Sequence, residues 1–230
     1  MIQKCLTGLI GFLLLPAVAG LALALYPGLI DFQMEAESAQ LLLRFFLGFA
    51  IQAVLFLCFP KAVRSYILAH ELSHILAAWL SGVRAGQLRV SKEGGSVEVE
   101  RSTFFIALSP YLIPFYSLLL ISVHYVAHLW WDPQLWSAWL PLGLGFTWSF
   151  HLSFTLYALS VTQSDISPYG RLGAFSFILF GNLLLLCLAL YWVNDRPAGE
   201  DLRHLLVHLK KSYVFSLTHL LENVKILKVD

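Results

Sequence analysis

The sequence predicts an all-α membrane protein: a polytopic bundle of about six transmembrane helices, a small β-hairpin after the third helix, and a C-terminal amphipathic helix. The 230 residues are 58% hydrophobic and only 13% charged, whereas soluble globular domains carry about 25% charged residues. Six apolar runs approach or exceed the roughly 20 residues that a helix needs to cross a bilayer. The net charge of +1 excludes the strong basic field of nucleic-acid binding proteins. The expected partner is therefore the lipid bilayer, and no nucleic acid is expected.

The first two apolar runs predict two spanning helices near the N-terminus. The first run extends from Leu6 to Ile30. A cleaved signal peptide would end near the small residues Ala17-Val18-Ala19, but the run continues well past them, which favours a retained anchor helix. The second run covers Ala39 to Phe59.

The third run, Ala62 to Ser81, differs from the others because it holds three ionisable side chains near its middle. The one clearly polar stretch before the C-terminus follows it, at 83–101. Apolar residues alternate with polar ones on both sides of Gly94-Gly95 in this stretch. Such alternation around a Gly-Gly pair predicts a β-hairpin with its turn at the glycines.

Three further runs predict the remaining spans. They are Phe104 to Trp130, Leu135 to Val161 and Leu172 to Val193. Pro110 and Pro114 are expected to kink the first of them, because proline removes a backbone donor and clashes with the preceding turn.

The C-terminal segment is polar enough to leave the bilayer core. Its apolar residues recur at helical spacing, which predicts an amphipathic helix lying on the membrane surface. We therefore expect one membrane domain over residues 1–195, with the hairpin at 83–101, and a peripheral tail helix over 196–230. The distribution of Lys and Arg does not select an orientation, since a re-entrant third run would reverse the count.

The chemistry lies in the third run, where His70-Glu71-Leu72-Ser73-His74 forms an H-E-x-x-H motif. Two histidines four residues apart share one face of a helix, so both imidazoles can reach one metal ion. The glutamate between them is placed to take a proton from metal-activated water. Ionisable groups at membrane depth are costly and default to a functional role. The alternative is a purely structural role, in which these three polar side chains are hydrogen-bonded and pack against another helix.

A catalytic zinc site usually has a third protein ligand, and the sequence leaves its identity open. Asp165 is the best-placed carboxylate, because it lies between the fifth and sixth runs and can turn back toward the bundle. His151, within the fifth run, is the main rival. Two further pairs have the same four-residue spacing: His124 with His128, which suits an interfacial position, and His204 with His208, which suits a solvated helix face.

Taken together, these features resemble the site-2 protease type of intramembrane zinc metalloprotease, in its compact bacterial branch that lacks PDZ domains. The resemblance covers 60–101 best, and the region of Asp165 less well. The family usually reads N-P-x-x-x-x-D-G or L-D-G there, whereas this chain has Ser164-Asp165-Ile166. The resemblance implies one Zn²⁺ bound by His70, His74 and Asp165, with Glu71 as the general base.

The resemblance also implies an activity, a substrate and a location. The chain would be a zinc metalloendopeptidase in a bacterial cytoplasmic (inner) membrane, cleaving a membrane-spanning or membrane-proximal protein. A hairpin strand, 87–90 or 97–100, would pair with the unwound substrate. Two alternatives stay open at this point: a catalytically silent zinc-binding protein that acts as a binding or regulatory partner, and a small transporter or structural membrane protein.

Overall fold

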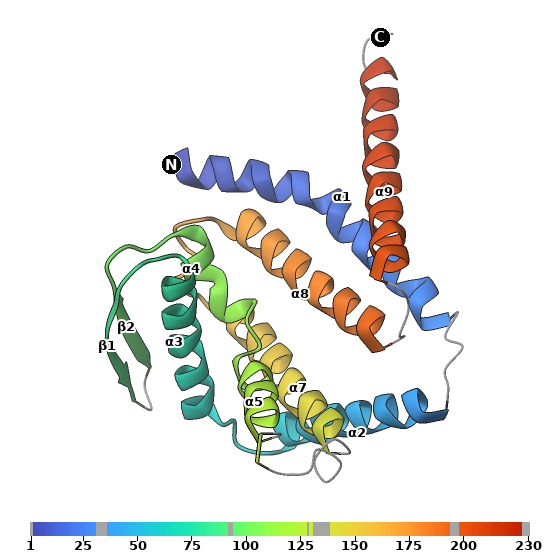
Figure 1. The fold of residues 1–230 in the computed structure, drawn as a ribbon. Coiled ribbons are helices and arrows are strands. Elements are labelled where there is room, and N and C mark those ends of the chain that lie inside the picture. The colour runs from blue at the N-terminus through green and yellow to red at the C-terminus, as the bar shows by residue number, and fades with distance from the viewer. Residues whose placement is uncertain are drawn as a thin grey trace. The chain divides into compact units, whose positions relative to one another are not determined.

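The computed structural model describes residues 2–30, 36–91, 94–127, 129–130, 139–193 and 198–226. The structure is mostly helical, at 77%, with one two-stranded sheet in the described part (Figure 1). The chain forms two compact units, one of residues 1–34 with 168–230 and the other of residues 35–167. The predicted boundary between a membrane domain and a tail, at 195/196, lies outside the described residues.

The first unit contains three long helices: α1 (Ile2–Ile30), α8 (Arg171–Val193) and α9 (Ala198–Ile226). Helix α1 packs against both α8 and α9. The α1–α8 crossing is close, because a Cβ added to Gly11 would lie 2.6 Å from the Cα of Gly173. Such small residues let helix backbones approach without intervening side chains.

The C-terminal helix α9 is confirmed as a helix, and it lies along α1. The Ser212 hydroxyl donates to the carbonyl of Pro16 at 2.5 Å, and the Tyr213 hydroxyl donates to that of Leu13 at 2.8 Å. Leu205 is buried in a cluster with residues of α1 and α8. The predicted apolar stripe thus packs partly on another helix, while Leu206, 55% exposed, lies outside that contact.

The second unit holds all the residues of the H-E-x-x-H motif. Its elements are α2 (Ala36–Cys58), α3 (Val63–Leu80), β1 (Ala85–Val90), β2 (Gly95–Val99), α4 (Phe104–Leu108), a 3-10 turn η1 (Ser109–Tyr111), α5 (Phe115–Ala127) and α7 (Leu140–Ser160). Helix α2 packs along α7, and α5 also packs against α7. The Ser117 hydroxyl lies 2.8 Å from that of Thr147 and links α5 to α7 by a hydrogen bond.

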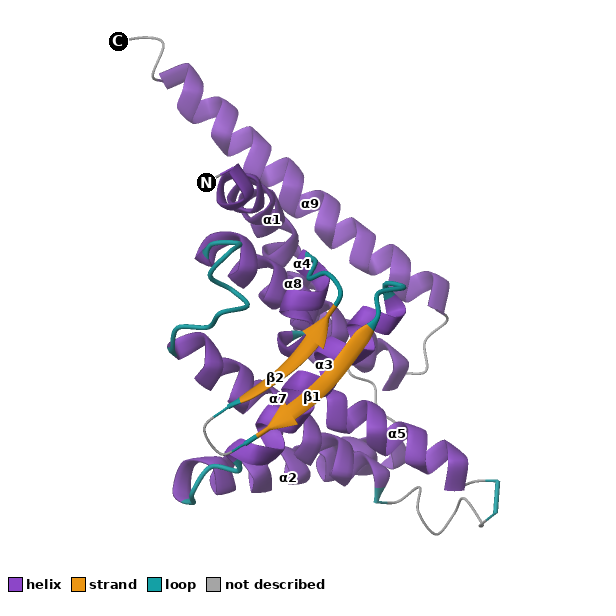
Figure 2. Ribbon diagram, turned by 90° about the vertical axis from the view of Figure 1, so that its left-hand side faces the viewer, coloured by secondary structure: helices purple, strands orange, loops and turns teal. Residues whose placement is uncertain are grey.

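The predicted β-hairpin is present as an antiparallel pair (Figure 2). Its turn differs from the prediction, however, because Gly95 begins β2 instead of closing the turn. A Cβ on Gly95 would lie 2.5 Å from Ile67 Cγ2 and 2.8 Å from Glu71 Cγ, whereas one on Gly94 would meet nothing within 4 Å. Gly95 is therefore explained by close contact with α3, and neither glycine has positive φ.

The fourth apolar run is broken, as its two prolines predict. Helix α4 and η1 end at Tyr111, and α5 restarts at Phe115 after a bend of 79°. The Thr103 side chain accepts a hydrogen bond from the Ile106 amide and caps α4. The break places the α4–η1 segment against α3, where the Ser109 hydroxyl donates to the carbonyl of Ser73 at 3.2 Å.

Three of the described helices are long and apolar enough to cross a membrane, or four if the bent pair counts as one span. They include Ile2–Leu25, Ala39–Cys58 and Arg171–Ala189. The chain is therefore a membrane protein by this criterion, while the predicted number of six spans is not shown. Helices α3 and α7 are not among these candidate spans. Helix α3 contains Arg64 and Glu71 in addition to the two histidines.

Candidate metal centre

Helix α3 presents the two histidines of the motif on one face. Its end is well defined, since Gly82 adopts φ +66° and the Val83 amide donates to the carbonyl of Ala78. This is the left-handed glycine arrangement that satisfies the last carbonyls of a helix. His70 and His74, one turn apart, have ring centroids separated by 4.9 Å.

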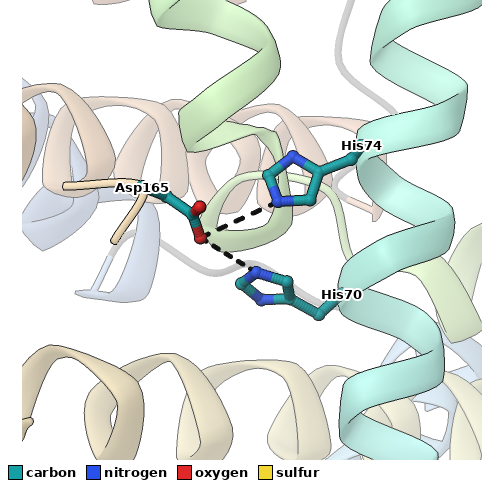
Figure 3. Close-up of side chains that lie close together, drawn as sticks. All are labelled: His70, His74 and Asp165. Carbon is teal, nitrogen blue, oxygen red and sulfur yellow. Dashed lines mark hydrogen bonds and ion pairs between the residues drawn. The ribbon is translucent and has the colours of Figure 1, made fainter. Parts of the chain in front are cut away.

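The structure brings Asp165 to this histidine pair, as Figure 3 shows. Asp165 Oδ2 lies 3.1 Å from His70 Nε2 and 3.7 Å from His74 Nε2. The three ligand atoms all lie within 4.8 Å of one another. Because two imidazole nitrogens and one carboxylate oxygen converge, the group can hold a metal ion.

The Nδ1 atom of each histidine, on the other side of the ring, is also engaged. His74 Nδ1 donates to the carbonyl of Ile106 at 2.8 Å, and His70 Nδ1 lies 3.2 Å from the Tyr66 hydroxyl. Metal-binding histidines usually make such a hydrogen bond, which fixes the ring and its tautomer. With a proton on each Nδ1, both Nε2 lone pairs are directed at the centre. The donor set therefore fits a divalent cation.

Asp165 reaches the centre because the chain turns sharply after α7. The side-chain Nε2 of Gln163 donates to the Ala158 carbonyl at 3.2 Å and caps the end of that helix. Burial by itself would raise the pKa of the Asp165 carboxyl, but in the metal-free centre hydrogen bonds and charges from protonated His70 and His74 outweigh it and hold that pKa well below its usual value. A bound cation would take the place of the protons on the two Nε2 atoms. The carboxylate is thus ionised and available to a cation.

Glu71 lies beside this centre and is buried, at 7% exposure. It lines an open cavity of about 460 Å³ together with both histidines and Asp165. The remaining wall includes β2, from Gly95 to Val99, and no described residue of β1. The general base proposed from the sequence, the three candidate ligands and one strand of the hairpin therefore share one cavity.

The rival histidines lie elsewhere. His151, on α7, lines a small neighbouring pocket with His70 but does not join the ligand group. His124 lies on α5, and His128 falls outside the described residues. His204 and His208 lie in the first unit on α9, with ring centroids 4.5 Å apart.

Two tyrosines at the centre were not predicted from the sequence. The Tyr111 hydroxyl donates to Asp165 Oδ2 at 3.3 Å, and its ring centroid lies 5.5 Å from that of His70. Tyr66 precedes His70 by one helical turn, so its spacing is a signal that sequence reasoning can use. Tyr111 has no such signal, because only the break after Pro110 brings it near.

Comparisons with protein-family models, with curated proteins and with solved structures gave no match to this chain.

Proposed function

We propose that the chain is an intramembrane zinc metalloendopeptidase, a multi-pass protein of the bacterial cytoplasmic membrane, of the site-2 protease type. The observation that carries the proposal is the convergence of His70 Nε2, His74 Nε2 and Asp165 Oδ2 beside Glu71. The alternatives from the sequence predict less of this arrangement. A polar trio that only joins helices has no need of a third ligand or of an adjacent cavity.

Zinc is the metal favoured by this donor set on an H-E-x-x-H helix. Two histidines and one carboxylate leave a position open for water, as in catalytic zinc sites. When bound, Zn²⁺ supplies a Lewis acid that activates water and polarises the scissile carbonyl. The same ligand set also serves non-haem iron(II), so metal analysis has to measure both ions.

Glu71 is the residue that would move the proton. It follows His70 directly, and its side chain lines the cavity in which a scissile peptide would lie. Glu71 would accept a proton from the attacking water and pass it to the leaving amine. Its Cγ lies close to Gly95, where an added Cβ would meet it at 2.8 Å.

We expect the substrate backbone to pair with strand β2. The Ser91 amide donates to the Gly94 carbonyl, so these two residues form a hydrogen-bonded pair next to the turn. Further along the ladder, Arg89 faces Ser96 and Leu88 faces Val97. Hydrogen-bonded and non-hydrogen-bonded pairs alternate in an antiparallel ladder. The N–H and C=O of Val97 therefore point away from β1, and an unwound substrate strand can pair with them.

The test is metal content and proteolysis of the full chain, purified in detergent and reconstituted. We expect about one zinc per chain in wild type and in Glu71→Gln, and none in His74→Ala or Asp165→Ala. The matched control is His208→Ala, which removes a histidine of the same helical spacing and should keep the metal. Cleavage of co-expressed single-span proteins should be lost in Glu71→Gln.

Different results contradict different parts of the proposal. Unchanged cleavage by Glu71→Gln would exclude its role as the base. Zinc at full occupancy without cleavage of any single-span protein would favour the silent metal-binding alternative. Absence of metal from wild type after zinc is supplied would reject the centre itself.

A further inference from the structure

A second and larger cavity lies in the same unit, on the side of α3 where α2 ends. Its volume is about 800 Å³, and α2, α5, α7 and the 59–62 linker form its walls. Apolar side chains dominate the lining, among them Leu55, Phe56, Leu119, Val123, Phe146 and Phe150. The size is in the range of small-molecule sites in proteins.

The lining of this cavity extends along the helices. Lining residues on α7 extend from Phe146 to Phe154, and those on α5 from Tyr116 to Val123. At 1.5 Å per residue these stretches are about 10–12 Å long. An apolar lining of that length has room for a segment of an acyl chain.

One end of the cavity carries a cation. Lys61 Nζ lies 5.3 Å from the ring centroids of Phe56 and Tyr157, so two cation–π contacts hold it there. Lys61 follows the candidate span Ala39–Cys58 by three residues, which places it at the membrane–water interface. Within the described part of the chain, no carboxylate forms an ion pair with Lys61, and none lines the cavity.

From these observations we infer that the cavity binds an anionic phospholipid of the bilayer. One acyl chain lies between α2, α5 and α7, and the phosphate lies beside Lys61. Charge selects the headgroup, because the described lining offers a cation and no carboxylate for the ammonium group of a zwitterionic lipid. This inference is independent of the proposed protease activity, since it rests on a different cavity and a different cation.

The test uses the intact chain in nanodiscs with equal amounts of phosphatidylglycerol and phosphatidylcholine, and native mass spectrometry of the lipids that stay bound. We expect one retained phosphatidylglycerol in wild type. Lys61→Gln should reduce its retention about tenfold or more, the factor that corresponds to ~1.5 kcal/mol for a hydrogen bond to a charged group. The matched control is Arg64→Gln, which removes an exposed nearby cation that does not line the cavity.

A second pair of variants tests whether an acyl chain occupies the cavity. Leu119→Trp fills the cavity from α5 and should displace the lipid, whereas Leu118→Trp, similarly exposed but outside the lining, should not. If Lys61→Gln and Arg64→Gln lose phosphatidylglycerol equally, the retention results from diffuse surface charge, and the proposed site is wrong. Equal retention of both lipids in wild type, or no difference between the two tryptophan variants, would overturn it as well.

Discussion

Each histidine of the metal centre is used on both sides of its ring. The Nε2 atoms of His70 and His74 face Asp165, while the Nδ1 atoms lie at the Tyr66 hydroxyl and the Ile106 carbonyl. Hydrogen bonds of this kind orient the imidazole ring before a metal binds, so the ring loses less conformational freedom on binding. The residues around the ligands should therefore matter nearly as much as the ligands.

Tyr66→Phe is expected to weaken metal binding by about 10-fold or more, because it removes the hydrogen-bond partner of His70 Nδ1. The measurement is zinc affinity by competition with a chromogenic chelator. Tyr157→Phe is the control, since that tyrosine also lines the cavity of the metal centre and, among the described residues, its hydroxyl makes no hydrogen bond to a candidate ligand. Equal affinity in wild type and Tyr66→Phe would show that the hydroxyl does not support His70.

Gly95→Val is expected to destabilise the second unit by about 1–3 kcal/mol, the usual cost of overpacking. The new side chain would collide with Ile67 and Glu71, whereas the adjacent Gly94→Val has open space. The readout is the free energy of unfolding of both variants in detergent. Similar values for the two would mean that β2 does not pack on α3 as described.

At the residue scale, the sequence predicted what its local spacing determines. His70 and His74 share a face because of helix geometry, and Asp165 was favoured because carboxylates near apolar runs are scarce. The Ile106 carbonyl and Tyr111 could not be predicted, since their positions depend on how a broken helix folds back onto α3. The role of Gly95 was misassigned, because a glycine at a close contact and a glycine in a turn look alike in sequence.

At the element scale, the broken fourth run is what completes the site. If Phe104–Ala127 formed one straight helix, Ile106 and Tyr111 would both lie on that continuous helix. Because Pro110 and Pro114 interrupt it, the short first part packs on α3, and its residue Ile106 supplies the carbonyl that accepts a hydrogen bond from His74. The sequence predicted the break, but the bend of 79° and its direction depend on tertiary packing.

The hairpin offers a test of which strand edge receives substrate. Val97→Pro removes an N–H that points away from β1 and should abolish most cleavage while leaving the metal bound. Its cross-strand partner gives the control, since Leu88→Pro removes an N–H on the opposite edge of the sheet. Rates of reporter cleavage and zinc content are compared in both. Greater damage from Leu88→Pro would place the substrate on β1.

The α1–α8 contact gives an element-scale prediction in the first unit. Gly11→Ala should lower the free energy of unfolding by about 1–3 kcal/mol, since its Cβ would meet the backbone of Gly173. Gly8→Ala, three residues away on the same helix, meets nothing within 4 Å and should be neutral or slightly stabilising. Thermal unfolding of both variants in detergent is the measurement. If both behave alike, the helices do not cross at Gly11.

At the scale of the whole molecule, the number of membrane crossings depends on α3 and α7. These helices contain the polar groups that face the cavities, so composition alone does not class them as spans. If all six runs cross, the hairpin and the segment with Asp165 emerge on one side and Lys61 on the other. The first half of that arrangement agrees with β2 and Ser164 lining one cavity. The second half does not, because Tyr157 lines the same cavity and its ring centroid lies 5.3 Å from Lys61 Nζ.

Cysteine labelling from one side of intact cells tests this arrangement. In a background with Cys5, Cys58 and Cys187 replaced by alanine, we expect Arg89→Cys and Ser164→Cys to react with an impermeant maleimide from the same side. If α3 crosses the bilayer between Lys61 and the hairpin, Lys61→Cys reacts only from the other side. Labelling of all three from one side would make α3 a re-entrant segment. The candidate metal centre would then open to the same aqueous compartment as Lys61, and the lipid and the substrate would approach the unit from the same leaflet.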